Sequence, residues 1–97
     1  MFDIFLTDHA REQLDELNED KGLNKRYKAV VKTIKFLGFN PRHPSLQTHP
    51  FTALEGPKEE KVFVAYAEQG TPAAYRVFWY YGPLESQITI IAITAHP

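Results

Sequence analysis

Residues 75–97 read YRVFWYYGPLESQITIIAITAHP, and two strand-like runs in this stretch flank a turn. The runs, Tyr75–Tyr81 and Ile88–Ala95, are rich in β-branched and aromatic residues, which suit a pleated and half-buried surface. Between the runs, Gly82 and Pro83 interrupt regular structure, and residues 85–87 are polar. The stretch therefore predicts a β-hairpin.

Side chains on a strand alternate between its two faces. In the first run this period assigns Tyr75, Val77, Trp79 and Tyr81 to one face, and Arg76, Phe78 and Tyr80 to the other. Arg76 is thus a charged residue between aromatic ones, and burying it without a partner is unfavourable. We expect Arg76 either to pair with an acid, for which Glu68 is a candidate, or to face a groove that binds an anion.

The chain of 97 residues fits one small domain, residues 1–97. It contains no cysteine, which excludes disulfides and thiolate metal sites. The N-terminus does not read as a signal peptide, and no apolar run approaches the roughly 20 residues of a membrane span. These features indicate a soluble cytoplasmic protein with no membrane partner.

The net charge of −1 conceals a marked asymmetry along the chain. Residues 1–20 carry seven acids and one base, whereas residues 21–42 carry seven bases and no acid. The basic segment is able to attract nucleic acid although the whole chain is not. The alternative is that the acidic and basic segments neutralise each other across a pair of helices.

The first half of the chain predicts a short strand and two helices. Residues 2–7 alternate as a strand does, and Thr7 or Asp8 is suited to cap a helix that ends near Gly22. Asn24 is suited to cap a second helix, which Gly38 ends. The apolar stripes of the two helices are Ala10, Leu14 and Leu17, and then Tyr27, Val30, Val31, Ile34 and Leu37.

Residues 40–57 show no clear periodicity and are expected to form a long loop, whereas Lys61–Ala67 predicts a strand and residues 68–74 a turn. The expected order is therefore strand, helix, helix and three strands. Strands joined by short turns favour an antiparallel sheet, and a helical hairpin covers one of its faces. The fold class is a two-layer α+β domain.

Together these elements resemble the RelE/ParE toxin superfamily of bacterial toxin–antitoxin modules. The resemblance rests on the first strand, the helical hairpin, the basic loop, the Tyr75-Arg76-Val77 strand and the last strand with His96, and it covers nearly the whole chain. It implies a β-α-α-β-β-β fold, a cognate antitoxin protein as partner and no cofactor. RelE-type members cleave mRNA on the ribosome without a metal. ParE-type members share the fold but inhibit DNA gyrase, and an inactive member kept as an interaction domain is the third possibility.

In the RelE-type reaction the messenger's 2′-hydroxyl attacks the adjacent phosphate, which requires a base, an acid and cations for the phosphate. The resemblance implies catalytic roles for two residues of this sequence. Arg76 matches an arginine that the family places on this strand, and a guanidinium suits bidentate contact with phosphate. His96 matches an acid or base near the C-terminus, since imidazoles exchange protons near neutral pH. Lys58 and Lys61 match lysines that hold phosphate.

The remaining candidate RNA contacts come from the residues themselves, and each has a structural alternative. Tyr80 shares the face of Arg76 and is suited to stack on a base, but strand aromatics more often pack in the core, as we expect for Trp79. Arg42 either meets RNA or solvates its loop, as do His43 and His49. Lys28 and Lys32 lie on one helical face with Lys25 and Lys35, either solvated or facing phosphate. A metal site built from the histidines has no recognised ligand spacing, and none is expected.

Overall fold

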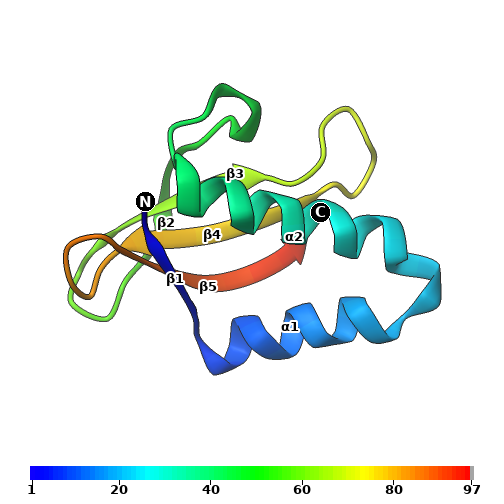
Figure 1. Cartoon of the computed structure of the whole chain (residues 1–97), viewed down its shortest axis with the longest axis horizontal. Coiled ribbons are helices and arrows are strands. Elements are labelled where there is room, and N and C mark those ends of the chain that lie inside the picture. The colour runs from blue at the N-terminus through cyan, green and yellow to red at the C-terminus, as the bar shows by residue number, and fades with distance from the viewer. Residues whose placement is uncertain (97) are drawn as a thin grey trace.

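The structure is a computed structural model that describes residues 1–96, so Pro97 lies outside the described residues. Its helices are α1 (Asp8–Glu19) and α2 (Asn24–Phe39), and its strands are β1 (Asp3–Leu6), β2 (His49–Glu55), β3 (Lys61–Tyr66), β4 (Tyr75–Tyr81) and β5 (Gln87–Ala95). Short 3-10 turns span Lys21–Leu23 and Pro44–Leu46. Both helices lie on the same side of the sheet and run in opposite directions (Figure 1). The predicted two-layer α+β fold is confirmed.

The strands form one five-stranded sheet in the order β1-β5-β4-β3-β2. The β4–β5 hairpin is the centre of this sheet, with Tyr75 opposite Ala95 and Tyr81 opposite Ile88. A bulge between Phe78 and Trp79 shifts the register, and bulges of this kind bend a sheet. The predicted hairpin is thus confirmed, and it lies between β3 on one side and β1 on the other.

The predicted antiparallel pairing of β3, β4 and β5 is confirmed, but one sheet prediction was wrong. The predicted loop at residues 40–57 contains an edge strand, β2, in which only Phe51 is even half-buried. Both faces of β2 meet solvent, and its sequence therefore shows no alternation. Pro50 is tolerated in β2 because one side of an edge strand has no partner strand that requires a backbone N–H. The sheet is also mixed, since β1 pairs in parallel with β5, Ile4 lying opposite Ile88. The chain between β1 and β5 includes both helices, which lets the two strands run in the same direction.

The helix boundaries follow local chemistry, with small shifts from the sequence prediction. Thr7 caps α1, because its side chain accepts a hydrogen bond of 3.1 Å from the backbone N–H of Ala10. Asn24 is the first residue of α2 and not its cap, and Leu23 in the cap position makes no side-chain hydrogen bond. Gly38 lies inside the last turn of α2, where its carbonyl accepts a 2.7 Å hydrogen bond from the N–H of Phe2. This bond ties the end of α2 to the start of β1.

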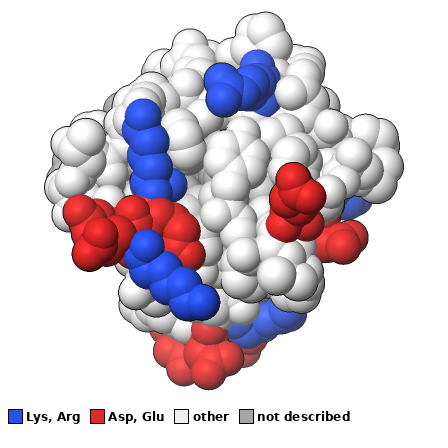
Figure 2. Space-filling view, turned by 90° about the vertical axis from the view of Figure 1, so that its left-hand side faces the viewer, with Lys and Arg blue, Asp and Glu red and all other residues white. Residues whose placement is uncertain are grey.

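The acidic and basic segments do not neutralise each other as an ion-paired helical hairpin. Across residues 1–96 the one ion pair joins Arg26 of α2 to Glu68, which follows β3. Lys28 and Lys32 are exposed on α2. At the end of the molecule seen in Figure 2, small basic and acidic groups alternate around an uncharged surface, and on the left an acidic group lies directly between basic side chains. On this face the charge does not form one continuous basic field.

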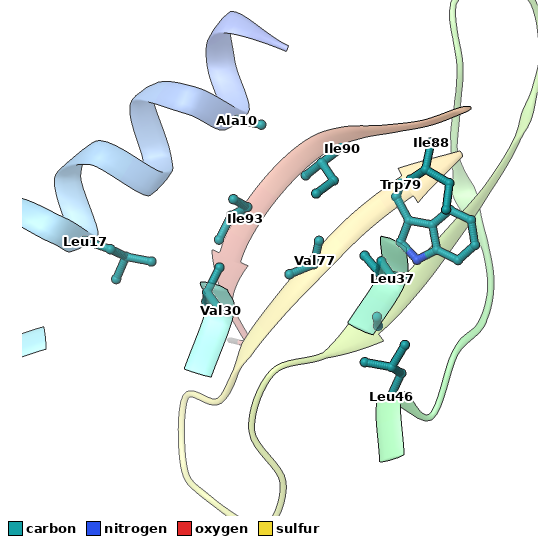
Figure 3. Close-up of a cluster of buried hydrophobic side chains, with 11 residues drawn as sticks. Ala10, Leu17, Val30, Leu37, Leu46, Val77, Trp79, Ile88, Ile90 and Ile93 are labelled. Atoms are coloured by element: carbon teal, nitrogen blue, oxygen red, sulfur yellow. The ribbon is translucent and has the colours of Figure 1, made fainter. Parts of the chain in front are cut away.

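The main core fills the space between the helices and the sheet (Figure 3). The helices contribute residues of the predicted stripes, and Trp79 of β4 is fully buried. Residues of the main core include Ala10, Leu17, Val30, Leu37, Val77, Trp79, Ile88, Ile90 and Ile93. A side-chain bond adds to this packing, since the N–H of Ile93 donates to Gln13 Oε1 of α1 at 2.7 Å.

A second apolar cluster lies on the other face of the sheet, which no helix covers in the described chain. We call this the open face, and it carries Val62, Val64, Tyr66, Arg76, Phe78 and Tyr80, with Phe51 packed against them. The alternation predicted for β4 is therefore confirmed, because Val77 and Trp79 belong to the main core and Phe78 and Tyr80 to the open face.

Candidate functional site

Arg76 lies on the open face, directly opposite Tyr66 of β3 and Thr94 of β5. Its guanidinium carbon is 5.0 Å from the ring centroid of Phe78 and 6.0 Å from that of Phe51. A guanidinium at this distance is attracted to the face of an aromatic ring. The two rings therefore hold the cation in place without neutralising its charge.

Arg76 has no carboxylate partner among residues 1–96, and its buried Nε makes no hydrogen bond within them. The predicted pairing with Glu68 is wrong, because Glu68 binds Arg26 instead. A half-buried cation with an unsatisfied N–H is unfavourable until an anion arrives. The arrangement suits the planar, bidentate recognition of phosphate or carboxylate.

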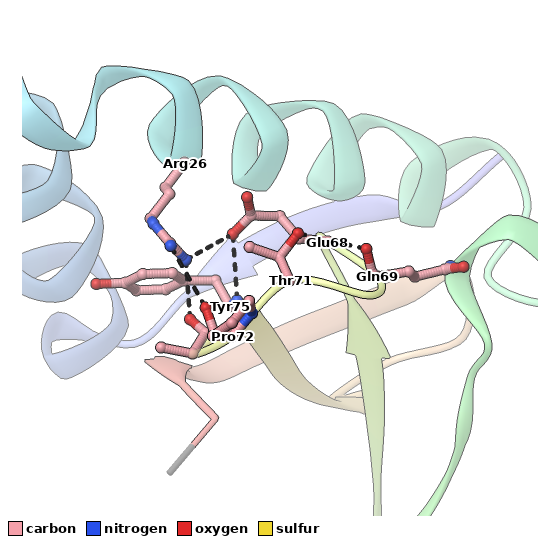
Figure 4. A network of polar contacts seen from close by, with 7 residues as sticks. Arg26, Glu68, Gln69, Thr71, Pro72 and Tyr75 are labelled. Carbon is pink, nitrogen blue, oxygen red and sulfur yellow. Dashed lines mark hydrogen bonds and ion pairs between the residues drawn. The ribbon is translucent and has the colours of Figure 1, made fainter.

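Arg26 joins α2 to the turn between β3 and β4 (Figure 4). Its Nη1 donates to Glu68 Oε1 at 3.1 Å and to the carbonyl of Ala73 at 2.9 Å, and Nη2 donates to the carbonyl of Pro72 at 3.4 Å. Its guanidinium carbon is 5.9 Å from the Tyr75 ring centroid. The sequence contained no signal for this role, since Arg26 is one of several bases in the same segment.

His96 extends the pairing of β4 and β5 by one step. Its backbone N–H donates to the carbonyl of Ala74 at 2.8 Å. Because Thr94 is opposite Arg76 and side chains alternate, His96 belongs to the open face with Arg76. Arg76 and His96 are thus diagonal neighbours, which in an antiparallel pair lie roughly 7–8 Å apart along the backbone.

A pocket of 470 Å³ lies beside His96 and is lined also by Tyr66, Glu68 and Ala74. Tyr66 is opposite Arg76 and lines this pocket with His96, so it belongs to the same site. Sequence reasoning missed Tyr66 as a site residue. The alternation of residues 61–66 contained the signal, because it places Tyr66 on the face of Val62 and Val64.

Tyr80 also lies on the open face, as predicted, but its side chain is 6% exposed and packs in the second cluster. It therefore presents little surface to a ligand. Phe51 and Tyr66, which lie nearer to Arg76, are half-buried and present more.

The other predicted RNA contacts lie away from Arg76. Arg42 and Lys61 line a separate pocket that includes Phe63 and Tyr81, which pack against the main core. Lys58 is exposed in the β2–β3 turn, where its backbone N–H donates to Glu60 Oε1 at 2.7 Å. Lys28 and Lys32 project from α2, on the helical side of the sheet. The structure thus brings Arg76, Tyr80 and His96 to one face and separates them from the predicted basic contacts.

Within residues 1–96, no group of three histidines or carboxylates is placed to hold a metal ion. In the same part of the chain, neither helix has the length and apolar character required to cross a membrane.

The sequence matches no known family profile and no curated protein. Solved structures with the same fold include the YoeB/ParE toxin from Agrobacterium tumefaciens, at a TM-score of 0.70 and 10% identity over 100% of both chains. The archaeal RelE–RelB complex from Pyrococcus horikoshii OT3 matches at 0.65 and 15% identity over 97% of this chain and 93% of that one. The YoeB dimer from Staphylococcus aureus matches at 0.64 and 13% identity over 99% and 98%.

These similarities establish the class of fold. The chain has the α+β fold of the RelE/ParE toxins over its full described length, as the sequence resemblance implied. At 10–15% identity the similarity concerns the fold alone, and the activity has to be argued from the site.

Proposed function

We propose that this chain is the toxin of a type II toxin–antitoxin module and that it cleaves mRNA on the ribosome. The observation that carries the proposal is Arg76, a cation held on an open sheet face by two aromatic rings, with no acid to neutralise it in the described chain. The toxin fold supports the proposal, and so does His96 on the same face.

In the proposed reaction the 2′-oxygen of the messenger forms a bond to phosphorus, and the bond from phosphorus to the 5′-oxygen breaks. Negative charge builds on the phosphate oxygens in the transition state, and the Arg76 guanidinium donates hydrogen bonds to them. The 2′-hydroxyl loses a proton and the leaving 5′-oxygen gains one. Two described histidines belong to this face: His96, and His49, which is opposite Val64 and stacks on Tyr66 with ring centroids 5.7 Å apart. The proposal assigns the proton transfer in this exchange to His96.

The proposed partners are the ribosome with its mRNA and a cognate antitoxin. The solved complex from Pyrococcus horikoshii pairs a RelE protein with RelB, and this supports an antitoxin partner for the present chain. The proposed location is the bacterial cytoplasm, where mRNA and ribosomes are found.

The test is 5′-end mapping of mRNA in bacteria shortly after the chain is induced without an antitoxin. We expect new ends inside translated codons, and a loss of about 100-fold or more in their abundance for Arg76→Ala, the range seen when one transition-state donor is removed. Arg76→Lys retains the positive charge but loses the planar guanidinium that donates two hydrogen bonds side by side, and we expect its mRNA cleavage to be impaired as well. Arg11→Ala, which removes an exposed arginine from α1, is the matched control and is expected to cleave normally.

Far-UV circular dichroism of each variant separates loss of activity from loss of folding. Normal cleavage by a folded Arg76→Ala variant would contradict the proposal. Growth arrest with intact mRNA would instead support inhibition of DNA gyrase, and a supercoiling assay would then decide. If the induced chain causes neither growth arrest nor mRNA cleavage, the remaining interpretation is an inactive interaction domain.

A further inference from the structure

A second pocket lies on the other side of the sheet from Arg76, between residues 42–50 and the ends of β3 and β4. We call it the loop pocket, and its lining includes Arg42, His43, Lys61, Phe63 and Tyr81. Phe63 and Tyr81 pack against the main core, which places the loop pocket on the helical side. Its volume of 440 Å³ lies in the range of about 300–1,000 Å³ that is usual for small-molecule sites.

The charge of the loop pocket favours an anion. Its lining contains Arg42 and Lys61 but no aspartate or glutamate. Both side chains are exposed, and neither forms an ion pair with a carboxylate of residues 1–96. Glu55 is opposite Lys61 in the β2–β3 register, and Glu55, Glu59 and Glu60 line an adjoining pocket with Lys61, but none of the three lines the loop pocket. Two unpaired cations beside a concave surface raise the local concentration of anionic ligands.

His43 adds a hydrogen-bond donor. The backbone N–H of Ser45 donates to His43 Nδ1 at 3.1 Å, and a backbone N–H is able only to donate. Because Nδ1 accepts, the ring N–H of His43 is on Nε2, and His43 lines the loop pocket. The ring is held by stacking on Phe36, with centroids 5.0 Å apart and an interplanar angle of 23°.

The wall of the loop pocket is aromatic. Phe63 stacks on Trp79 with centroids 5.0 Å apart, and Tyr81 meets Phe63 edge-on at 5.7 Å. Lys61 Nζ is 5.7 Å from the Phe63 centroid, so a cation lies directly beside the aromatic surface. Nucleobases stack on aromatic side chains, while lysine and arginine hold the attached phosphate.

We propose that the loop pocket binds a nucleoside monophosphate unit, with the phosphate between Arg42 and Lys61 and the base against Phe63 and Tyr81. The unit is either a free nucleotide or one nucleotide of a single-stranded RNA. This inference does not depend on ribonuclease activity, because the loop pocket and Arg76 lie on opposite faces of the sheet.

The experiment titrates the full chain with AMP, adenosine and inorganic phosphate, by calorimetry and by fluorescence. Trp79 is the one tryptophan of the chain and stacks on Phe63, so its emission reports on the pocket wall. We expect saturable binding of AMP, and weaker binding of adenosine and of phosphate. Arg42→Ala and Lys61→Ala should each weaken AMP binding about tenfold, the effect of losing one charge-assisted contact. Lys21→Ala removes an exposed lysine between the helices and should bind AMP normally.

Three results would overturn the inference: no saturable AMP binding, unchanged binding by both pocket variants, or phosphate binding as tight as that of AMP. Titration with a short single-stranded oligoribonucleotide distinguishes a free nucleotide from one nucleotide of an RNA chain. If the oligoribonucleotide binds more tightly than AMP, and both Arg42→Ala and Lys61→Ala lose this binding, RNA is the occupant. If the oligoribonucleotide binds no more tightly than AMP, the occupant is a free nucleotide.

Discussion

Replacing Arg26 with alanine tests the contact that joins α2 to the β3–β4 turn. The change removes a 3.1 Å charge-assisted hydrogen bond to Glu68, a 2.9 Å bond to the carbonyl of Ala73 and a weaker one of 3.4 Å to Pro72. Glu68 then retains one long hydrogen bond, from the backbone N–H of Tyr75 at 3.4 Å.

The magnitude follows from the burial of the pair. Exposed ion pairs contribute about 0–1 kcal/mol, whereas breaking a fully buried pair destabilises by roughly 3–5 kcal/mol. The side chains of Arg26 and Glu68 are 26% and 13% exposed, which lies between these limits. We therefore expect Arg26→Ala to lower the free energy of unfolding by about 2 kcal/mol. For a domain of this size that corresponds to a fall in Tm of roughly 8–16 °C.

Thermal and urea unfolding followed by circular dichroism measure the change, with Lys25→Ala as the control, since Lys25 is an exposed neighbour on the same helix. A double-mutant cycle with Glu68→Gln isolates the pairwise energy, which we expect to be about 1 kcal/mol. The reasoning would be refuted if Arg26→Ala lowered the free energy of unfolding by no more than Lys25→Ala does.

The remaining predictions concern a cap, a glycine and the support of Arg76. Thr7→Ala removes the cap of α1 and should destabilise by about 1 kcal/mol in urea unfolding, whereas Thr7→Ser should not. Gly38→Ala should be neutral or stabilise by up to about 1 kcal/mol, because the new Cβ would lie 3.5 Å from its nearest atom, the Phe2 carbonyl oxygen, and alanine favours the helix; a lower Tm would contradict this. If the proposed function holds, Phe51→Ala should reduce mRNA cleavage by loosening Arg76 without changing charge, and unchanged cleavage would show that the ring is not needed.

Local patterns were sufficient for much of the fold. Alternation along residues 75–81 predicted which side chains of β4 face the helices, and Trp79 is indeed fully buried. The stripes of α1 and α2 and the cap at Thr7 were also readable, because helix and strand periods and capping act over a few residues. The same alternation placed Arg76 and Tyr80 together on the other face.

Tertiary packing decided the rest. β1 pairs in parallel with β5, which places Asp3 opposite Gln87. The sequence of β2 shows no hydrophobic alternation because both faces of this strand meet solvent. Glu68 pairs with Arg26 and not with Arg76, and Arg42 and Lys61 share a pocket on the helical side, away from Arg76. Contacts of this kind depend on which distant residues the packed elements bring within a few ångströms. A sequence period describes only which way a side chain faces, and so it leaves open what that side chain meets.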